Sequence, residues 1–490
     1  MRIGDIIGFR EDLFFDGAVQ IDWFYNQAKA NRVASSFVFH GKEYFGISDE
    51  LTGNQMTDTI SFFRAVANKI EDEQRGNPFT LAIAEYGTGK SHLAVTLAQL
   101  LSGKGYMPNT YNKIIDNIRR IDNEASKQIE SVCDKPNLVL AINGMRDFNL
   151  HYEILKAASR SLRLYGYSDD NLKKLNRAHE TAFRFFERNI ETSILRFEKK
   201  ARDFGWVEQG KSLADKLRRT MSEDNTAFKI INGVYEEING HEIRWDEGVS
   251  ANLVLETLLR EYCGISGEFN KIVIIFDEFG RYLEYASSAD SAQSGDSALQ
   301  QIFESIQNSD GNIQMINFIQ SDIKVYLQRV DKTRNISRYI GRYDASEKFH
   351  LSSNLETVFA NLIDRKNKDA FSIYIKGWLN KNEQELAVLY SNMDKWLPLK
   401  GLWKDKMLFS QVIVEGIYPL HPISTYMLTG LSGYLQNRSS LTLVNNHITV
   451  LSNYEISPGQ ACPLVLPEQL LDGDLYFELL SAEQEGRQLS

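Results

Sequence analysis

Five short apolar runs alternate with longer amphipathic stretches between residues 79 and 351. An unbroken apolar run of strand length is typical of a strand buried on both faces, whereas apolar residues three or four positions apart indicate a helix. The runs occupy residues 79–84, 137–144, 271–276, 312–320 and 348–351. Because buried strands that alternate with helices build parallel sheets, the pattern predicts an α/β fold in three layers, with helices on both faces of the sheet.

The first 76 residues differ from this alternating region. Aromatic residues crowd the first 50 positions, and apolar residues at helical spacing run from residue 57 to residue 73. The pattern predicts a short helix over residues 21–30 and a strand over residues 33–39, VASSFVF. We therefore expect residues 1–76 to form an N-terminal arm and a helix that pack against the core.

Most of the remaining chain has a helical pattern. A polar helical stretch covers residues 113–133, and a highly charged one between residues 152 and 262 predicts a helical insertion in a core of residues 77–354. Acidic residues alternate with the basic ones of this insertion, which favours a solvated face, although a nucleic-acid contact stays open. Further helices are expected over residues 355–365, 368–379, 383–389 and 411–436. They predict a C-terminal helical lid or subdomain, residues 355–490.

Length and charge narrow the class of protein. The 490 residues suggest about two to four domains. The 55 Lys and Arg residues against 65 Asp and Glu residues leave a net charge of −10. A protein that coats nucleic acid is normally basic, so this charge argues against that role without excluding a local basic groove.

The cysteines and the hydropathy of the chain indicate in which cellular compartment the protein is expected. The three cysteines are far apart and lack CxxC spacing, which favours buried thiols in a reducing environment. The sequence shows neither a secretory signal pattern nor a run of about 20 apolar residues. We therefore expect a cytoplasmic protein without a membrane span.

A glycine-bearing loop after the first apolar run carries the strongest chemical signal. It reads Ala84-Glu85-Tyr86-Gly87-Thr88-Gly89-Lys90-Ser91 and leads into the amphipathic run 91–101. A strand, a glycine loop and a helix in this order form the setting of a phosphate loop, where backbone N–H groups and the helix N-terminus hold a triphosphate. The loop therefore predicts a site for ATP and Mg²⁺, and the alternative is a tight turn with an exposed lysine.

Each residue type in this loop suits that task. Glycines let the backbone approach the phosphates, Lys90 can reach the β and γ phosphates, and Ser91 can ligate Mg²⁺. The consensus GxxxxGK[ST] has glycine where this chain has Ala84, which we expect to change the start of the loop without loss of binding. His92 follows directly and is included among the nucleotide-binding candidates, although a structural role is favoured for it.

Two acidic residues, Asp277 and Glu278, follow the third apolar run. In glutamate-dependent P-loop NTPases, the ASCE class, the aspartate supports the Mg²⁺ shell and the glutamate orients and deprotonates the attacking water. The alternative is a helix N-cap by Asp277. Together with the loop, the acid pair predicts an ATPase in which Ser91 and Asp277 are the metal ligands.

Five further polar residues are weaker candidates. Gln320 ends the fourth apolar run, where AAA+ proteins place a polar residue that holds the water, and Asn317 is the alternative. Arg342, or else Arg338, would reach the γ-phosphate of a neighbouring subunit, which requires an oligomer. Arg438 would contact phosphate from the lid of the same chain. For each of them an ordinary surface or strand-end role stays open.

Short motifs extend the pattern beyond these residues. The segment GTGKSHLA resembles the phosphate loop of AAA+ proteins such as replication-helicase loaders and origin-recognition ATPases. The ordered set IIFDEFGRYLE, IGRYD and YPLHPISTYMLTGLSGYLQNRSSLTLV is similar to the large P-loop ATPases of bacterial anti-phage defence, including the BREX-type BrxC and PglY proteins. The resemblance covers residues 79–444 except for the insertion. Where that family often has QNERT, this chain has QNRSS at residues 436–440.

The resemblance implies an AAA+ or STAND-like ATPase that acts as an oligomeric motor or switch with an effector protein of the same defence system, and it leaves a DNA or RNA contact open. It carries over Lys90, Ser91, Asp277, Glu278, Arg342 and Arg438. Two alternatives remain: an ATP-gated scaffold with negligible turnover, and a DNA-binding loader, which the acidic charge does not support. Because such relatives are usually longer and the chain ends directly after a helical pattern, we expect a fragment of a larger protein.

Overall fold

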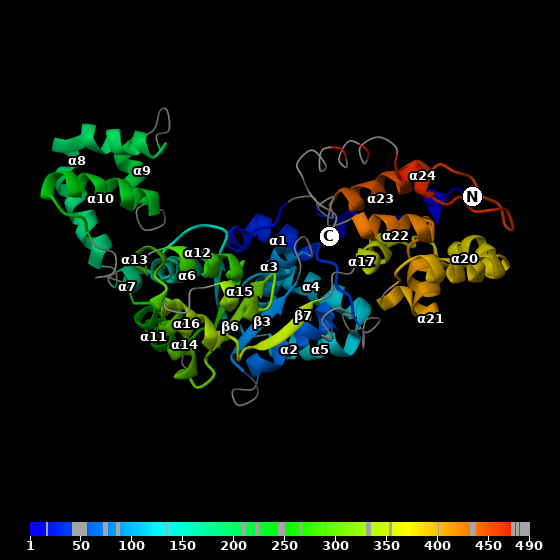
Figure 1. Cartoon of the computed structure of the whole chain (residues 1–490), viewed down its shortest axis with the longest axis horizontal. Coiled ribbons are helices and arrows are strands. Elements are labelled where there is room, and N and C mark those ends of the chain that lie inside the picture. The colour runs from blue at the N-terminus through cyan, green and yellow to red at the C-terminus, as the bar shows by residue number, and fades with distance from the viewer. Residues whose placement is uncertain are drawn as a thin grey trace.

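A six-stranded parallel sheet lies at the centre of the computed structural model of this chain (Figure 1). The structure describes residues 1–15, 18–41, 56–71, 77–84, 89–133, 135–173, 175, 177–206, 212–220, 225–243, 250–263, 267–289, 291–329, 335–351, 355–399, 401–431, 438–471, 476 and 480. Within these residues, helices cover both faces of the sheet, so the α/β class expected from the pattern is confirmed.

Five of the six strands were predicted from the apolar runs. The strands are β2 (Met56–Thr57), β3 (Phe79–Ile83), β4 (Leu138–Asn143), β5 (Ile272–Asp277), β6 (Ile313–Ile319) and β7 (Glu347–Leu351). Their order across the sheet is β2-β7-β3-β6-β5-β4, and every neighbouring pair is parallel. The two-residue strand β2 at one edge was not predicted, because so short a segment has no pattern of its own.

Strand β5 shows why these runs are apolar throughout. All six of its residues are buried. Val273 and Ile275 belong to the hydrophobic cluster on one face of the sheet, and Ile272, Ile274 and Phe276 belong to the cluster on the other. Successive side chains point to opposite faces, so helices on both sides leave no solvent-facing position within the strand.

Two helical layers sandwich the sheet. One layer contains η3 (Ile21–Tyr25), α1 (Gln27–Ser35), α2 (Thr59–Glu71), α3 (Lys90–Leu101), α4 (Pro108–Ile121) and α5 (Asn123–Val132). The other contains α6 (Leu150–Leu164), α11 (Ala251–Tyr262), α12 (Phe279–Ser288), α14 (Ser297–Gln307), α15 (Ile323–Arg329) and α16 (Asn335–Tyr343), with the short α7 (Asp170–Lys173) and α13 (Ser291–Ser294) beside it. Helix α3, which follows the predicted phosphate loop, therefore lies in the first layer.

The predicted strand over residues 33–39 is wrong. Helix α1 continues to Ser35, and the following residues up to 41 form no strand. Asn26 caps the start of α1 by accepting a hydrogen bond from the Lys29 N–H (3.1 Å). Val33 and Ala34 are buried against α3, so tertiary packing outweighs the strand preference of this β-branched segment.

Two other predicted helices are each divided. The stretch 113–133 is split at Asp122, whose carboxylate accepts hydrogen bonds from the N–H groups of Glu124 and Ala125 and so begins α5. The helix expected over residues 411–436 ends at residue 416, and α22 (Pro422–Leu431) begins only after a turn with a cis peptide bond at Pro419. Residues 432–437 lie outside the described part.

Three helices of the expected insertion form a unit of their own. They are α8 (Arg177–Asp203), α9 (Leu213–Thr220) and α10 (Asn225–Asn239), and they share a separate hydrophobic cluster between Ala178 and Ile243. Figure 1 shows this unit standing away from the sheet. The expected limits 152–262 also include α11 and most of α6, which pack on the sheet itself.

The C-terminal part is helical, as expected from its pattern. It contains α17 (Leu355–Leu362), α18 (Lys368–Ala370), the π-helix η6 (Phe371–Lys376), α19 (Gly377–Lys381), α20 (Glu383–Trp396), η7 (Gly401–Trp403), α21 (Lys406–Leu408), the π-helix η8 (Phe409–Gly416), α22, α23 (Arg438–Leu451) and α24 (Pro467–Leu470). These elements share one hydrophobic cluster.

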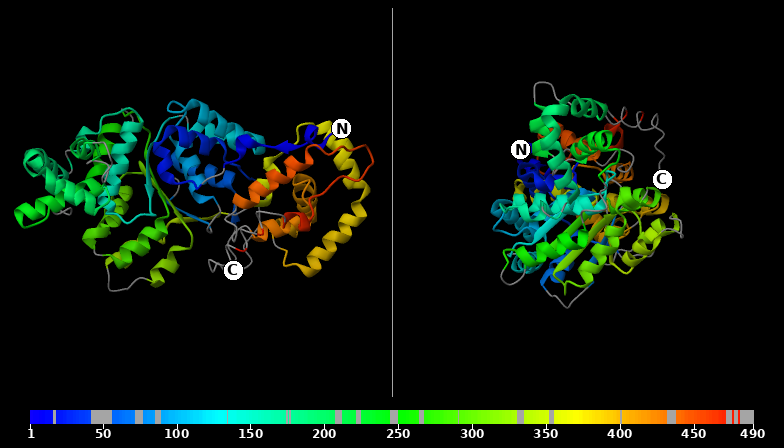
Figure 2. Two further views of the ribbon diagram at one scale, coloured as in Figure 1. Left: turned by 90° about the horizontal axis from the view of Figure 1, so that it is seen from above. Right: turned by 90° about the vertical axis from the view of Figure 1, so that its left-hand side faces the viewer.

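The N-terminal arm joins two parts of the molecule. Its first elements are η1 (Ile3–Asp5), β1 (Gly8–Phe9) and η2 (Glu11–Leu13). Strand β1 pairs antiparallel with β8 (Ile363–Asp364), and Ile3, Ile6 and Ile7 are buried in the C-terminal cluster. Figure 2 shows the N-terminus beside the C-terminal helices. Only the later part of the arm packs against the sheet, which corrects the expectation for residues 1–76.

Candidate functional site

Three neighbouring strands end side by side at the carboxyl edge of the sheet. Strand β6 lies between β3 and β5 and pairs with both of them. Ala84 follows β3, Gln320 follows β6, and Asp277 ends β5 with Glu278 directly after it. Because the strands are parallel, this order brings the phosphate-loop strand and the acid-pair strand to the same edge, with Gln320 between them.

Lys90 is buried at the start of α3, where the loop meets the helix. Only 6% of its surface is exposed. Its Nζ donates a hydrogen bond to the carbonyl oxygen of Ala84, at 3.0 Å, so the amine reaches back across the loop. Gly89 caps the helix with φ of +81°, a conformation that favours glycine. Residues 85–88, which include the candidates Glu85, Tyr86, Gly87 and Thr88, lie outside the described residues.

Ser91 and Asp277 contact each other across the site. The Ser91 hydroxyl donates a hydrogen bond to the Asp277 carboxylate, which is only 2% exposed. Burial raises the pKa of Asp277 to about 6, and the neighbouring charge of Glu278 adds to this rise. The bond from Ser91 and the charge of Lys90 act in the opposite direction. A hydroxyl and a carboxylate are oxygen donors of the kind that Mg²⁺ prefers, so this pair fits the expected metal.

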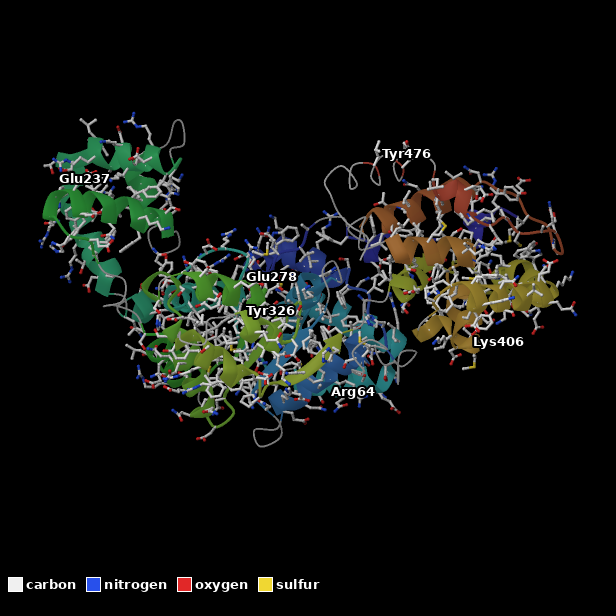
Figure 3. The ribbon with its side chains drawn as sticks, viewed as in Figure 1. Arg64, Glu237, Glu278, Tyr326, Lys406 and Tyr476 are labelled. Atoms are coloured by element: carbon white, nitrogen blue, oxygen red, sulfur yellow. The ribbon has the colours of Figure 1, made fainter. Side chains whose placement is uncertain are left out.

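Glu278 adopts an unusual backbone conformation. Its φ of +54° and ψ of +38° place it in the left-handed region, which costs a residue other than glycine free energy. Its N–H donates to Asp277 Oδ1 at 3.1 Å, and its Oε2 accepts a hydrogen bond from Gln320 Nε2 at 3.2 Å. In Figure 3, Glu278 is labelled at the upper edge of the sheet. The strained turn holds its carboxylate at the edge where β5 and β6 end.

Of the two candidates on the fourth run, only Gln320 contacts the acid pair. Asn317 pairs in register with Leu81 and Phe276, inside the sheet. Its side chain is fully buried, and neither amide atom has a hydrogen-bond partner among the described residues. The structure therefore places the amide of Asn317, the alternative candidate, within the core and not at the edge where the acid pair lies.

The candidate His92 points away from the site. Its Nε2 lies 2.7 Å from the carbonyl oxygen of Val33, and the rings of Phe15 and Phe37 pack edge-on against it. Burial lowers the pKa of His92 to about 4, so the ring is neutral at physiological pH. His92 thus anchors α3 to the N-terminal arm. Its inclusion among the nucleotide-binding residues is corrected, and the favoured structural role fits these contacts.

Arg342 lies at the opposite end of the sheet from Glu278. Its guanidinium pairs with Glu304 at 3.5 Å and lies over the ring of Phe303. That ring stacks on Phe79, the first residue of β3, whereas the acid pair comprises the last residue of β5 and the residue after it. The described contacts therefore do not bring Arg342 to the acid pair of its own chain.

The other two candidate arginines have fewer described contacts. Arg338 is exposed on α16, one turn before Arg342. Arg438 begins α23, in the C-terminal helical part, and its side chain lies outside the described residues. Neither is brought to the acid pair by a described contact within the chain.

The end of β4 contributes residues that sequence reasoning missed. Asn143 pairs in register with Asp277, and the N–H of Gly144 donates to the Asp277 carbonyl oxygen at 2.8 Å. A Cβ on Gly144 would overlap the carbonyl oxygen of Glu278. The only sequence signal was the polar Asn-Gly pair at the end of a buried run, which is also typical of an ordinary turn.

Neither a membrane span nor a similarity to known proteins adds to the description of the site. Within the described part of the chain, no helix combines the length and the apolar character needed to cross a bilayer. No protein-family model matches the chain, and a search of curated proteins finds no match. The functional argument therefore depends on the geometry of the site and on the motifs in the sequence.

Proposed function

We propose that this chain is a P-loop ATPase of the glutamate-dependent AAA+ or STAND-like type, which binds ATP with Mg²⁺ and hydrolyses it. One observation carries the proposal. A buried lysine and a serine at the start of α3 face a buried aspartate, and the adjacent glutamate is held by an amide from the intervening strand. Five predicted residues from three sequence-distant segments thus meet at one edge of the sheet.

Lys90 and the start of α3 would hold the phosphates. The amine is buried at the start of α3, where it donates to the Ala84 carbonyl oxygen and its charge interacts with Asp277. A phosphate is a stronger partner for a buried ammonium than a carbonyl group. The N-terminus of α3 adds the positive end of a helix dipole at the same place.

Ser91 and Asp277 would hold the metal ion. When bound, Mg²⁺ neutralises the charge that develops on the phosphates. The raised pKa of Asp277 fits this role, because a buried carboxylate without a cation is costly and a divalent cation would stabilise its charged form.

Glu278 would be the general base, and Gln320 would orient it. A water molecule that attacks a phosphate must lose a proton, and the Glu278 carboxylate can accept it. The bond from Gln320 fixes one carboxylate oxygen, and no described hydrogen bond occupies the other. The position of Gln320 between β3 and β5 supports the role expected for an AAA+ water-holding residue.

The arginines on α16 support an oligomeric form. The described contacts of Arg342 are with Glu304 and Phe303 and not with the acid pair of its own chain, and Arg338 is exposed one turn away. An arginine that reaches a neighbour's γ-phosphate stabilises the transition state, so the proposed active form is a homo-oligomer in which α16 faces the next subunit.

The wider role follows from the resemblance alone. We propose a motor or switch in bacterial anti-phage defence that acts on an effector protein of the same system. The helical unit α8–α10 is a candidate surface for that effector or for nucleic acid, because it stands apart from the sheet and has its own core.

Substitution of Glu278 tests the activity directly. The Glu278→Gln variant keeps the size and polarity of the side chain but cannot accept the proton, so we expect turnover to fall by roughly 100-fold or more while ATP affinity is kept. Phosphate release and the affinity for a fluorescent ATP analogue would be measured on the same preparation. Unchanged turnover would show that Glu278 is not the base, and wild-type binding without turnover would favour the ATP-gated scaffold.

A further inference from the structure

The N-terminal arm covers the free edge of the sheet next to the acid pair. Strand β4 is an edge strand among the described residues, and one side of its backbone has no neighbouring strand there. The Tyr25 hydroxyl occupies this side, where it accepts from the Ala141 N–H (2.9 Å) and donates to the Ala141 carbonyl oxygen (3.0 Å). The arm thereby satisfies two backbone groups that the sheet leaves unpaired.

Asp22 of the same arm is bound to the end of β4. Its Oδ2 accepts a hydrogen bond from Asn143 Nδ2 at 2.8 Å, and its Oδ1 pairs with Arg160 of α6 at 3.0 Å. The Arg160 guanidinium also lies over the ring of Tyr25, 3.9 Å from its centre. Burial acts to raise the pKa of Asp22, but the bonds from Asn143 and Arg160 outweigh it, so the pKa is lowered and the carboxylate stays charged.

The end of β4 in turn supports the catalytic glutamate. Asn143 Oδ1 accepts from the Met145 N–H at 3.0 Å, which fixes the turn that contains Gly144. Gly144 donates to the carbonyl oxygen of Asp277 and leaves no room for a side chain beside the carbonyl oxygen of Glu278. The left-handed conformation of Glu278 is costly, so it persists only because surrounding contacts such as these hold it.

We propose that Asp22 is a positioning residue for Glu278, which acts through Asn143 and Gly144. The inference rests on the proposed ATPase function and adds a role for the arm that packing alone does not require. Loss of the Asp22 carboxylate frees Asn143 to turn, and the peptide of Gly144 can then shift away from Glu278. The base is displaced while the start of α3, which holds the nucleotide, is untouched.

Kinetics on full-length variants separate this role from a general loss of stability. In Asp22→Asn and in Asn143→Ala we expect kcat to fall about 10- to 100-fold, because small misplacements of a base are costly. Affinity for a non-hydrolysable ATP analogue should stay within about 2-fold of wild type, since the described bonds of Asp22 go to Asn143 and Arg160 and not to the start of α3. The double variant should be no slower than Asn143→Ala alone, because both changes break one connection.

Asp12→Asn is the matched control. Asp12 is also an arm carboxylate, but it pairs with Lys113 of α4 at 3.0 Å, away from the end of β4. Its loss should leave kcat unchanged. Should Asp22→Asn fail to bind the analogue, which would indicate misfolding, Asn143→Ala carries the test alone, with the same expected fall in kcat.

The outcomes are distinct. The positioning role is overturned if the Asp22 variant keeps wild-type kcat. It is also overturned if the fall in kcat of the double variant equals the product of the falls in the two single variants. In both cases the ATPase proposal stands. A wild-type protein that binds ATP but shows no turnover overturns the ATPase proposal, and the positioning role falls with it.

Discussion

Gly144 packs directly against the main chain of Glu278, and its N–H donates to the carbonyl oxygen of Asp277 at 2.8 Å. A side chain at position 144 would overlap the Glu278 carbonyl oxygen, while the Asp277 carbonyl oxygen would lie 3.1 Å from the new Cβ. Both neighbours are backbone atoms, which cannot move aside as a flexible side chain can. The two strands β4 and β5 therefore meet at a contact that only glycine permits.

Gly144→Ala should displace the turn at Glu278. We expect a loss of about 1–3 kcal/mol in the free energy of unfolding, because overpacking forces backbone shifts, together with a fall in kcat. Denaturant melts and ATPase assays measure the two effects. Gly341→Ala on α16 is the control, since its Cβ meets no atom within 4 Å and should stabilise the helix by about 0.5–1 kcal/mol. Equal effects at both positions would contradict the close contact.

Two buried lysines at opposite ends of β3 should behave differently. Lys90 bonds to Ala84 at the carboxyl end, and Lys69 bonds to Thr80 and pairs with Glu347 at the amino end. Lys90→Ala should weaken ATP binding by about 10- to 100-fold, the value of a charge-assisted hydrogen bond, with little loss of stability. Lys69→Ala should lower stability and leave ATP affinity unchanged. Isothermal titration and thermal melts distinguish them, and a reversed result would place the phosphate site elsewhere.

Acid should stop the proposed ATP hydrolysis through Asp277. Its pKa is raised from 3.8 to about 6 by burial, so the carboxyl takes up a proton already below about pH 6 and can no longer hold Mg²⁺. We expect kcat/KM to fall about 10-fold for each pH unit below this value. More Mg²⁺ should move the acid limb to lower pH, because the ion competes with the proton. An acid limb that does not respond to Mg²⁺ would point to another group.

The same carboxyl has a consequence for stability. The pKa of Asp277 is higher in the folded state than in the unfolded state, so the protonated carboxyl stabilises the fold. This stabilisation is fully present below the unfolded pKa and is lost as pH rises through about 6. The nucleotide-free protein therefore carries a buried charge at neutral pH. Asp277→Asn should raise its free energy of unfolding at pH 8 by about 1–2 kcal/mol while abolishing turnover. A melt in the absence of Mg²⁺ measures this gain.

Substitutions of Gln320 and Asn317 test which of these two polar residues supports Glu278. Gln320→Leu removes the bond to Glu278 and should lower kcat by roughly 10- to 100-fold with little change in ATP affinity. Asn317→Leu replaces a buried amide that has no partner among the described residues, so it should stabilise the fold by about 1 kcal/mol and leave kcat unchanged. A slow but stable Asn317→Leu variant would reverse the assignment of the two residues.

Mixing experiments test the arginine from a neighbouring subunit. Arg342→Ala should lower kcat by about 1,000-fold, the effect of losing an arginine finger, and keep ATP affinity. Glu304→Gln breaks the same ion pair within the chain and leaves the arginine free, so its kcat should not fall. Mixing Arg342→Ala with Glu278→Gln should restore some activity, because some interfaces then contain an intact site. No recovery in a mixed oligomer would argue against action between subunits.

Several features of this protein could be derived from the sequence alone. The five long strands appear as apolar runs because both faces of the sheet are covered, and that pattern is local. Helix α3, the lysine at its start and the acid pair after β5 were found in the same way, since each motif needs only a few consecutive residues. The strand expected over residues 33–39 shows the limit, because a local preference for strand was outweighed by packing on α3.

Only the tertiary structure decided which polar residues meet at the acid pair. Gln320 and not Asn317 reaches Glu278, because the register of β6 places one at the edge and the other in the core. The hydrogen bond between Asp22 and Asn143 joins residues 121 positions apart, which no local pattern encodes. Sequence periodicity reports which residues are buried, whereas contacts between distant segments depend on strand order and register, and these are set by packing of the whole fold.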